Sequence, residues 1–252
     1  MSDSQDPMAA RIPALSTGTV QGVVIPPASA AAAARTGGAL DLSHFHLVWD
    51  HDFSVNHSFA PELTRVWGSV SLDPSYATLS SYATTGWPHA GMMQPPTGGT
   101  AGQGYGLYSI TAKIDKGEGP GAYACLWPAT DQWPGPELDL VEKQSTSNTS
   151  GYSTIHWKDP ATGSDQYEVH LFPTTIDLSA KHTYALDWEA DHIALYIDRQ
   201  QIYSTTQHVP QDAAHGGQNE CFGAGMQPWG TQNHDGSNIW HVYDMSYSSP
   251  IG

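Results

Sequence analysis

The sequence has few of the residues that several large classes of protein require. Only nine Lys and Arg stand against 25 Asp and Glu in 252 residues, which gives a formal net charge of −16. Nucleic acids and anionic membranes attract basic side chains, so neither is an expected partner. No apolar stretch approaches the roughly 20 residues that span a bilayer. The composition therefore favours a protein that acts on a neutral partner, away from the membrane core.

Cysteine is equally scarce, since the chain contains only Cys125 and Cys221. One disulfide is the most that they can form. Both lie in apolar, strand-like segments, where two buried thiols are at least as good an interpretation as a bridge. No spacing of His and Cys indicates a zinc site. The glycines of residues 98–104 lack the strand-to-helix context of a phosphate-binding loop.

Glycine and proline, by contrast, are plentiful, with 25 Gly and 18 Pro. At this density they punctuate many short strands, and no stretch shows a long helical period. The length suits one all-β domain. Alternating apolar residues predict two stacked antiparallel sheets, with strands near residues 46–53, 66–72, 105–115, 122–127, 137–143, 152–157, 167–172, 182–190, 192–198, 201–206, 220–226 and 239–247.

Residues 1–43 differ in composition from the rest of the chain. They are rich in Ala, Pro, Ser and Thr, and bury little apolar surface. We expect them to form a flexible tail, and residues 44–252 to form the β-sandwich domain. The first residues, MSDSQDP, lack the basic and apolar regions of a signal peptide.

The most informative segment is WPGPELDLVEKQ, residues 133–144. Its acids Glu137, Asp139 and Glu142 are embedded in an apolar strand. Side chains alternate along a strand, so Glu142 would point away from the other two acids. A one-residue β-bulge would return it to their face. Three carboxyl groups crowded on one strand add no stability, but a retaining glycosidase needs two of them about 5–5.5 Å apart.

This motif resembles the active-site strand of glycoside hydrolase family 16, which includes laminarinases, lichenases, agarases and carrageenases. The bulged subgroup of that family carries Glu-x-Asp-x-x-Glu. Segments at 47–53, 105–114, 121–128 and 184–198 resemble other strands of the family, and His156-Trp157 matches a common pair. Two departures are the missing Arg after Tyr108 and the turn Asp198-Arg199 in place of Asp-Gly.

The resemblance implies a jelly-roll, concanavalin A-like sandwich with an open cleft on its concave sheet. It also implies roles for the three acids. Glu137 would be the nucleophile and Glu142 the acid/base, while Asp139 would hydrogen-bond a neighbour and tune its charge. Crowded carboxyl groups disfavour full ionisation, so one Glu is expected to stay protonated near neutral pH.

Aromatic rings stack on the apolar faces of sugars, so tryptophans near the acids are candidate substrate contacts. We expect Trp127 and Trp157 to line the cleft rather than the core, and Trp133 to form a wall just before the catalytic strand. The loop that contains Gln227 and Trp229 is expected to line the opposite side. A further prediction is that His156, from the matched pair, lies in the cleft beside the acids.

Members of the family often carry a structural calcium on the convex face. Asp52 and Asp244 stand at the positions that the resemblance implies for its ligands, and carboxylate oxygens suit Ca²⁺. No cofactor is expected to be required for catalysis.

Together these features predict a secreted, monomeric, endo-acting β-glycanase with retaining chemistry. Its expected substrate is a neutral polysaccharide, a β-1,3-glucan or a mixed-linked β-1,3-1,4-glucan. Four alternatives remain: a transglycosylase, a galactanase, a hydrolase of bacterial exopolysaccharide, or a lectin-like glycan-binding protein without catalysis. A lectin would typically lose one of the key acids, and here all three are present.

Overall fold

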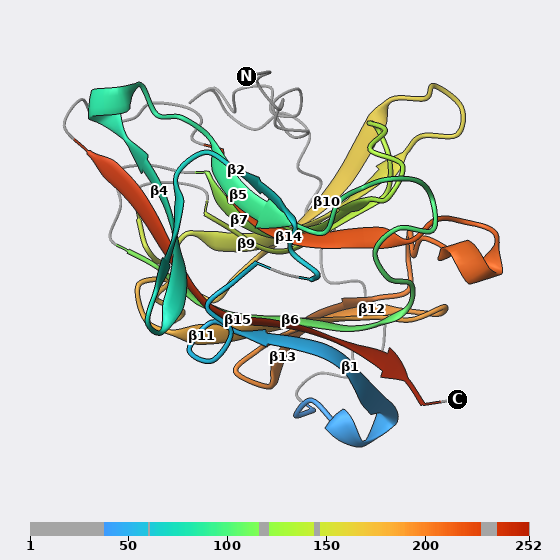
Figure 1. The fold of residues 1–252 in the computed structure, drawn as a ribbon. Coiled ribbons are helices and arrows are strands. Elements are labelled where there is room, and N and C mark those ends of the chain that lie inside the picture. The colour runs from blue at the N-terminus through green and yellow to red at the C-terminus, as the bar shows by residue number, and fades with distance from the viewer. Residues whose placement is uncertain (1–37, 60, 116–120, 144–146, 228–235, 252) are drawn as a thin grey trace.

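The computed structural model describes residues 38–59, 61–115, 121–143, 147–227 and 236–251. Within these residues, fifteen strands form two antiparallel sheets that stack face to face (Figure 1). The helical segments are three short 3₁₀ turns, η1 (Leu42–His44), η2 (Ala83–Thr85) and η3 (Ala213–His215). The predicted all-β sandwich is confirmed.

The eight-stranded sheet has the order β13-β12-β11-β6-β15-β4-β3, and β1 also pairs with β15. Its strands are β1 (Phe45–Asp52), β3 (Val70–Asp73), β4 (Tyr76–Tyr82), β6 (Gly106–Ile114), β11 (His182–Trp188), β12 (Ile193–Ile197), β13 (Gln200–Thr205) and β15 (Ser237–Pro250).

The seven-stranded sheet has the order β10-β9-β8-β7-β14-β5-β2. Its strands are β2 (Arg65–Trp67), β5 (Ala90–Met93), β7 (Ala122–Pro128), β8 (Glu137–Lys143), β9 (Gly151–Lys158), β10 (Asp165–Leu171) and β14 (Glu220–Met226). The acid motif therefore lies on β8, near the middle of this sheet.

The main core fills the space between the sheets. Leu138 of β8 and Phe222 of β14 meet Tyr108, Trp188 and Trp240 of the other sheet there, and none of the five side chains is exposed. Full burial of a large apolar side chain contributes roughly 1.5–3 kcal/mol. Side chains of a strand alternate between its two faces, so the residues that pack in this core determine which residues of the same strand lie on the outer face.

The predicted strands agree with the observed ones to within a few residues, with two exceptions. The single strand predicted at 66–72 is divided into β2 and β3 by Gly68. This residue has a φ of +66°, and a Cβ there would lie 2.0 Å from the backbone oxygen of His89. The second exception is the segment 73–104, in which no strand was predicted but which contains β4 and β5.

The folded part of the chain includes several residues that the composition assigned to the tail. Leu40 is buried against Leu107 and Ala185 on the outer face of the eight-stranded sheet. Its backbone N–H donates to the carbonyl of Arg199 at 2.9 Å. The packed region therefore begins before residue 44, and the rest of the predicted tail lies outside the described residues.

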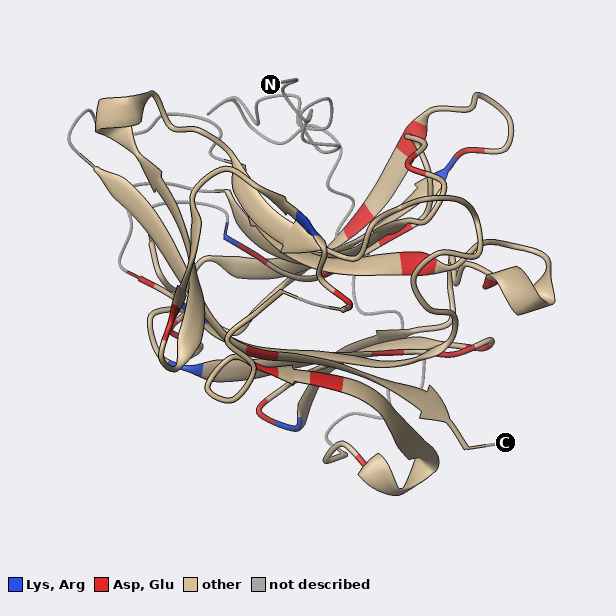
Figure 2. Cartoon of the chain, in the orientation of Figure 1, with Lys and Arg blue, Asp and Glu red and all other residues tan. Residues whose placement is uncertain are grey.

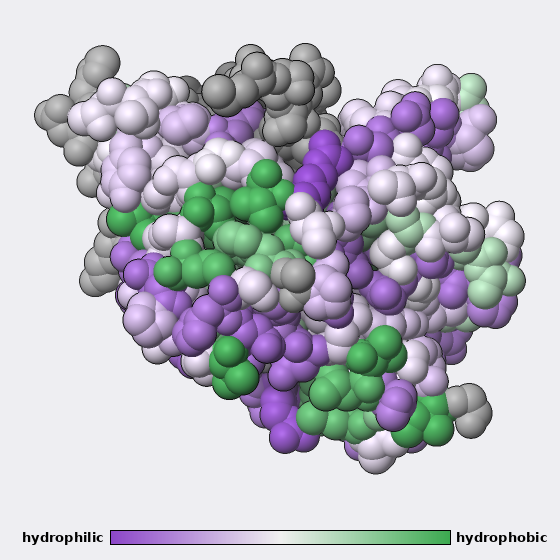
Figure 3. Space-filling model, in the orientation of Figure 1, coloured by the Kyte–Doolittle hydropathy of each residue, from purple (hydrophilic) through white to green (hydrophobic). Residues whose placement is uncertain are grey.

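Charged and apolar residues are distributed differently over the surface. Acidic segments occur on both sheets and outnumber the basic ones (Figure 2). Apolar side chains gather at the lower right of the view, over β1 and the C-terminal end of β15 (Figure 3), where Leu47, Val48 and Ile251 are more than half exposed. Among the described residues, no helix has the length and apolar character needed to cross a membrane.

Candidate active site

A β-bulge in β8 places the three acids on one face. In the pairing of β8 with β7, Asp139 stands opposite Cys125, but the register shifts before Val141 pairs with Ala124. The same shift separates Leu138 from Glu142 in the pairing with β9. Leu138, Leu140 and Val141 all pack in the main core. Because two successive residues point inward, Glu142 returns to the outer face with Glu137 and Asp139, as the sequence predicted.

The acids differ in burial. Glu137 and Asp139 have no exposed surface, whereas Glu142 is half-buried. An open cleft of the kind that the resemblance implies would expose all three. Burial in a medium of low dielectric disfavours charge, and three carboxyl groups on one strand disfavour it further.

Two hydroxyl groups of β9 orient Glu142. Thr154 Oγ1 donates to Glu142 Oε2 at 2.6 Å, and Tyr152 Oη donates to Glu142 Oε1 at 3.2 Å. Each carboxylate oxygen thus has its own donor, which fixes the plane of the group. The sequence analysis did not identify these two residues. The alternation of β9 places both on the face of His156 and is the signal that would have found them.

His156 connects the acid cluster to the edge of the sheet. Its register partner on β8 is Glu137, its Nε2 lies 3.7 Å from Asp139 Oδ2, and its Nδ1 lies 3.1 Å from Asp165 Oδ1. The imidazole therefore stands between the carboxyl groups of Asp139 and Asp165, and its hydrogen bond goes to Asp165. The structure places His156 beside the acids, as predicted.

Two of the predicted tryptophans lie on the acid-bearing face. Trp127 and Trp133 stack with centroids 5.6 Å apart and planes 11° apart, and Trp133 meets His156 edge-on at 5.3 Å. Trp127 is almost fully buried, and its Nε1 donates to Asp131 Oδ1 at 2.8 Å. A cis peptide bond joins Trp133 to Pro134. These rings form an aromatic wall next to the start of β8.

Glycines of neighbouring strands make room for two more aromatic rings on this face. A Cβ at Gly91 would lie 2.2 Å from Trp67 Cζ2, and a Cβ at Gly225 would lie 2.2 Å from Tyr123 Oη. The two rings therefore lie close over the backbone of β5 and β14. Tyr123 is the register partner of Glu142, so this aromatic surface begins directly beside the acid.

The prediction that Trp157 lines the cleft is wrong. Trp157 packs against the main core and stacks on His208 at 3.6 Å, with planes 4° apart. The reason is the alternation of β9, in which neighbouring residues point to opposite faces. Since His156 shares the face of the acids, Trp157 must point to the other side.

The remaining predicted contacts are only partly described. Gln227, one residue after β14, is buried, and its backbone N–H donates to the carbonyl of Gly121 at 2.8 Å. Trp229 lies outside the described residues.

The two cysteines are thiols rather than a disulfide. On the paired strands β7 and β14, Cys221 stands opposite Trp127, while Cys125 stands opposite Gly223.

Cys125 is another residue of this face that the sequence analysis did not place in the site. Its ligand atom lies within 4.8 Å of those of Glu137 and Asp139. Alternation along β7 places Cys125 on the same face as Trp127, and that pattern could have identified it. Its closeness to the acids depends on the pairing of β7 with β8, which the sequence does not specify.

The two predicted calcium ligands meet on the opposite side of the molecule. Asp52 of β1 is the register partner of Asp244 of β15. Burial, and then the neighbouring Asp50 and Asp52, raise the pKa of Asp244, while Thr111 and Lys181 oppose this shift. Paired like charges destabilise a sheet. Ser54 donates two hydrogen bonds to Asp52 and lowers the pKa of that carboxyl group. Calcium binding stays a prediction, in which Asp52 and Asp244 would hold the cation through carboxylate oxygens.

Comparison with known proteins agrees with this geometry. The model of the family described as "Glycosyl hydrolases family 16" matches residues 93–226, more than half of the chain. A beta-glucanase of Bacillus licheniformis is 30% identical over 130 residues, which cover 50% of either protein. A beta-glucanase of Brevibacillus brevis is 22% identical over 149 residues, or 58% of this chain and 56% of that protein. The chain thus spans about half the length of these relatives.

Solved structures share the fold over a larger part of the chain. The laminarinase catalytic domain of Thermotoga maritima MSB8 superposes with a TM-score of 0.63 at 14% identity, covering 82% of this chain and 99% of that domain. The laminarinase of Rhodothermus marinus gives a TM-score of 0.62 at 17% identity, covering 83% and 99%. The family predicted from the acid motif is thereby confirmed. The chain belongs to family 16 of the glycosyl hydrolases.

Proposed function

We propose that this protein hydrolyses internal β-glycosidic bonds of a β-glucan by double displacement. The observation that carries the proposal is the projection of Glu137, Asp139 and Glu142 from one face of the bulged strand β8. Crowding three carboxyl groups in this way costs stability, and a retaining glycosidase is the chemistry that uses them.

In the first step, a carboxylate oxygen of Glu137 attacks the anomeric carbon of the sugar. The bond from that carbon to the glycosidic oxygen breaks as Glu142 donates a proton to the leaving oxygen. The product is a glycosyl ester of Glu137. Because Glu137 has no exposed surface, this attack requires that the groups covering it move aside when the substrate binds.

In the second step, Glu142 acts as the base. It removes a proton from water, the water oxygen attacks the anomeric carbon, and the ester bond to Glu137 breaks. The sugar leaves with its original anomeric configuration, and Glu142 regains its proton. Thr154 and Tyr152 hold the Glu142 carboxyl in one orientation for both transfers. Asp139, between the two glutamates, would tune their charge, and His156 lies 3.7 Å from it.

The proposed substrate is a neutral β-1,3 or mixed-linked β-1,3-1,4-glucan. The relatives of this protein carry the name beta-glucanase, and a laminarinase shares its fold. A neutral polymer avoids repulsion by a chain with a net charge of −16. Trp133, which is partly exposed and stacks on the buried Trp127, offers an apolar face of the kind on which sugars bind. Polysaccharides are degraded outside the cell, so we propose that the protein is secreted. We also propose that it acts as a monomer.

Product analysis on a panel of polysaccharides tests the function. The panel contains laminarin, mixed-linked β-glucan, cellulose, xyloglucan, agarose, carrageenan and bacterial exopolysaccharides. Oligosaccharides from laminarin or mixed-linked glucan are expected, with retention of configuration in the first product by NMR. Cleavage of agarose, carrageenan or an exopolysaccharide instead would overturn the substrate, and inversion would overturn the mechanism. Products longer than the substrate would indicate a transglycosylase.

Two matched variants separate chemistry from folding. Glu137→Gln is expected to abolish cleavage while glycan binding and the melting temperature persist. Glu168→Gln is the control, because Glu168 of β10 pairs with the core-facing Ile155 and so lies on the other face of the same sheet. Binding without cleavage by the unmodified protein would favour a lectin-like protein.

A further inference from the structure

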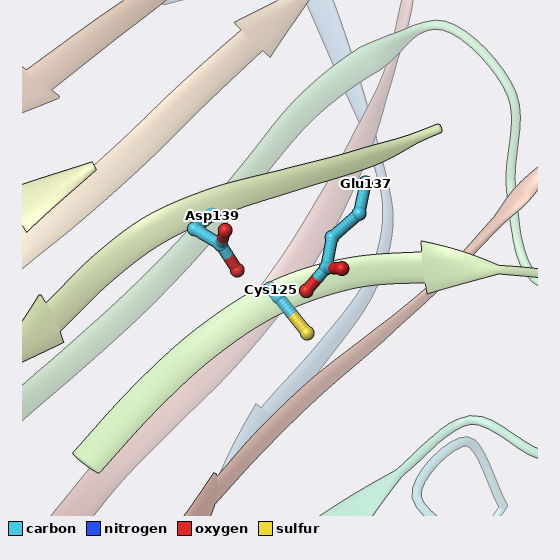
Figure 4. A group of neighbouring side chains, drawn as sticks. All are labelled: Cys125, Glu137 and Asp139. Atoms are coloured by element: carbon cyan, nitrogen blue, oxygen red, sulfur yellow. The ribbon is translucent and has the colours of Figure 1, made fainter. Parts of the chain in front are cut away.

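A thiol stands among the acids of the candidate active site. Cys125 of β7 is directly opposite Asp139 of β8, and Glu137 lies two residues before Asp139 on the same strand. The three side chains point toward one another (Figure 4), and their ligand atoms all lie within 4.8 Å of one another. None of the three residues has exposed surface. A retaining glycosidase mechanism uses carboxyl groups and has no role for this thiol.

One thiolate sulfur and two carboxylate oxygens are a ligand set for a thiophilic divalent cation. Zinc binds Cys sulfur at about 2.3 Å and carboxylate oxygen at about 2.0–2.2 Å, so ligand atoms in a tetrahedral site are about 3.5 Å apart. The three ligand atoms, all within 4.8 Å of one another, would have to approach one another to reach that spacing. Three protein ligands leave a fourth position for water. Calcium and magnesium prefer six or more oxygens, so this set selects against them.

Charge and burial favour the same occupant. When ionised, Cys125, Glu137 and Asp139 would place three negative charges in a fully buried volume, which is costly in a low dielectric. A divalent cation offsets most of that charge. The Nε2 atom of His156 lies 3.7 Å from Asp139 Oδ2, beside the proposed ligand set. Binding would release the thiol proton, so affinity is expected to rise with pH.

We propose that Cys125, Glu137 and Asp139 bind a thiophilic divalent cation of the zinc group, and that the bound cation switches the enzyme off. A Glu137 carboxylate that ligates the cation has no lone pair directed at a sugar carbon. The inhibition rests on the proposed function. The binding site rests only on the three side chains.

Cadmium is a spectroscopic probe of the site, because a Cd–thiolate bond gives an ultraviolet charge-transfer band. Titration of the purified full chain with Cd²⁺ is expected to produce this band with one equivalent bound, and Zn²⁺ is expected to displace it. Excess Ca²⁺ is expected to leave it unchanged. Absence of the band in the folded protein would overturn the proposal, as would its loss on addition of Ca²⁺.

The second cysteine provides a matched control. Cys221 is also fully buried and belongs to the same outer-face cluster as Cys125, on the neighbouring strand β14. Cys125→Ser is expected to lose the band, and Cys221→Ser to keep it. The reverse result, or a band retained in both variants, would overturn the assignment. Asp139→Asn keeps the thiol and is expected to weaken Cd²⁺ binding at least tenfold, and unchanged affinity would remove Asp139 from the site. Circular dichroism confirms that each variant is folded.

A separate assay tests the inhibition. Zn²⁺ is expected to abolish polysaccharide cleavage by the unmodified protein, and EDTA to restore it. Cys125→Ser is expected to lower sensitivity to Zn²⁺ at least tenfold, whereas Cys221→Ser keeps normal sensitivity. Full activity of the Zn²⁺-loaded protein would overturn the inhibitory role. If no polysaccharide is cleaved at all, the proposed function fails, while the Cd²⁺ titration still decides whether the site exists.

Discussion

Glu137 and Glu142 project from the same face of β8 although they are five positions apart along the chain. An odd spacing puts two residues of a regular strand on opposite faces. The bulge corrects this by directing both Leu140 and Val141 into the main core. The same pair of apolar residues that anchors β8 to the core thus brings the second glutamate to the first. The packing of β8 against the core and the proposed pairing of the two glutamates in catalysis therefore both depend on this one β-bulge.

The two glutamates are expected to respond differently to substitution. Glu142→Ala removes the proton donor but leaves the proposed nucleophile, so an activated aryl glycoside that needs no proton should still form the glycosyl ester. Azide should then accelerate turnover by attacking that ester. The measurement is the rate of aryl release with and without azide. Neither substrate nor azide should rescue Glu137→Gln, and rescue there would reverse the two roles.

Thr154 is expected to act as a positioning residue for Glu142. Its hydroxyl donates to the carboxylate at 2.6 Å, and Thr154→Val removes that donor while keeping the shape of the side chain. The loss of one such hydrogen bond is worth about 1–1.5 kcal/mol, so kcat should fall about tenfold with little change in KM. Tyr152→Phe removes the longer bond, of 3.2 Å, and should cost less. If the melting temperature falls in parallel with kcat in both variants, the two hydroxyl groups have a structural role only.

A methyl group at Gly91 is expected to displace the ring of Trp67. The added Cβ would lie 2.2 Å from Trp67 Cζ2, and overpacking of this kind costs about 1–3 kcal/mol. Gly91→Ala should therefore lower the free energy of unfolding by that amount in denaturant titration. Gly99→Ala is the control, because its Cβ would make only an ordinary contact, 3.7 Å from Thr130 Cγ2. Equal stability of both variants would contradict the close approach of the Trp67 ring.

The Asp52–Asp244 pair predicts stabilisation by calcium. If Ca²⁺ at 100 times its Kd relieves the repulsion between these two aspartates, the protein gains about 2.7 kcal/mol, or roughly 5–10 °C in Tm. EDTA should remove this gain, as followed by scanning calorimetry. Asp244→Asn should lower the Tm in calcium and abolish the effect of EDTA. A Tm that is the same with and without chelator would exclude the site.

His192 lies at the eight-stranded sheet, beside a cavity of about 760 Å³ that is lined in part by Asp187 and Asp191. We expect its side chain to make the stability of the protein depend on pH. Hydrogen bonding, first to Asp187 and then to Asp191, raises the pKa of His192 from 6.5 to about 9. Because the folded state binds the His192 proton more tightly than the unfolded state, protonation stabilises the folded protein. This stabilisation is complete below pH 6.5 and is lost as the pH rises through about 9. Because the side chain is partly exposed, we expect a loss on the order of 1 kcal/mol.

The check is the melting temperature of His192→Gln between pH 6 and pH 9.5. The variant should be less stable than the unmodified protein at the acidic end, and the difference should vanish at the alkaline end. His46→Gln, on an exposed position of β1, should follow the unmodified protein throughout. A difference that stays constant with pH would show that His192 acts through packing rather than through its charge.

Much of the molecule could be predicted from alternation and turn residues. The strands with clear period-2 patterns, such as β6 and β8, have nearly the predicted limits, because each must present one row of apolar residues to the core. Strands β4 and β5 were missed. β5 is buried along its whole length, and its sequence AGMM has no polar row to reveal the alternation. The aromatic contacts were predicted less well, since a tryptophan suits the core and a sugar site equally.

The sequence by itself determined the class of fold, the family and the three acids of β8, including the bulge that aligns them. These properties depend on spacing along one strand, which the order of residues specifies. Tertiary structure decided which residues surround those acids. The closeness of Cys125 to Asp139, the donors that hold Glu142, and the meeting of Asp52 with Asp244 all depend on which strands pair and in what register. That register is set by the apolar patterns of both partner strands together and by the turns that join them, so the sequence of one strand alone does not specify it.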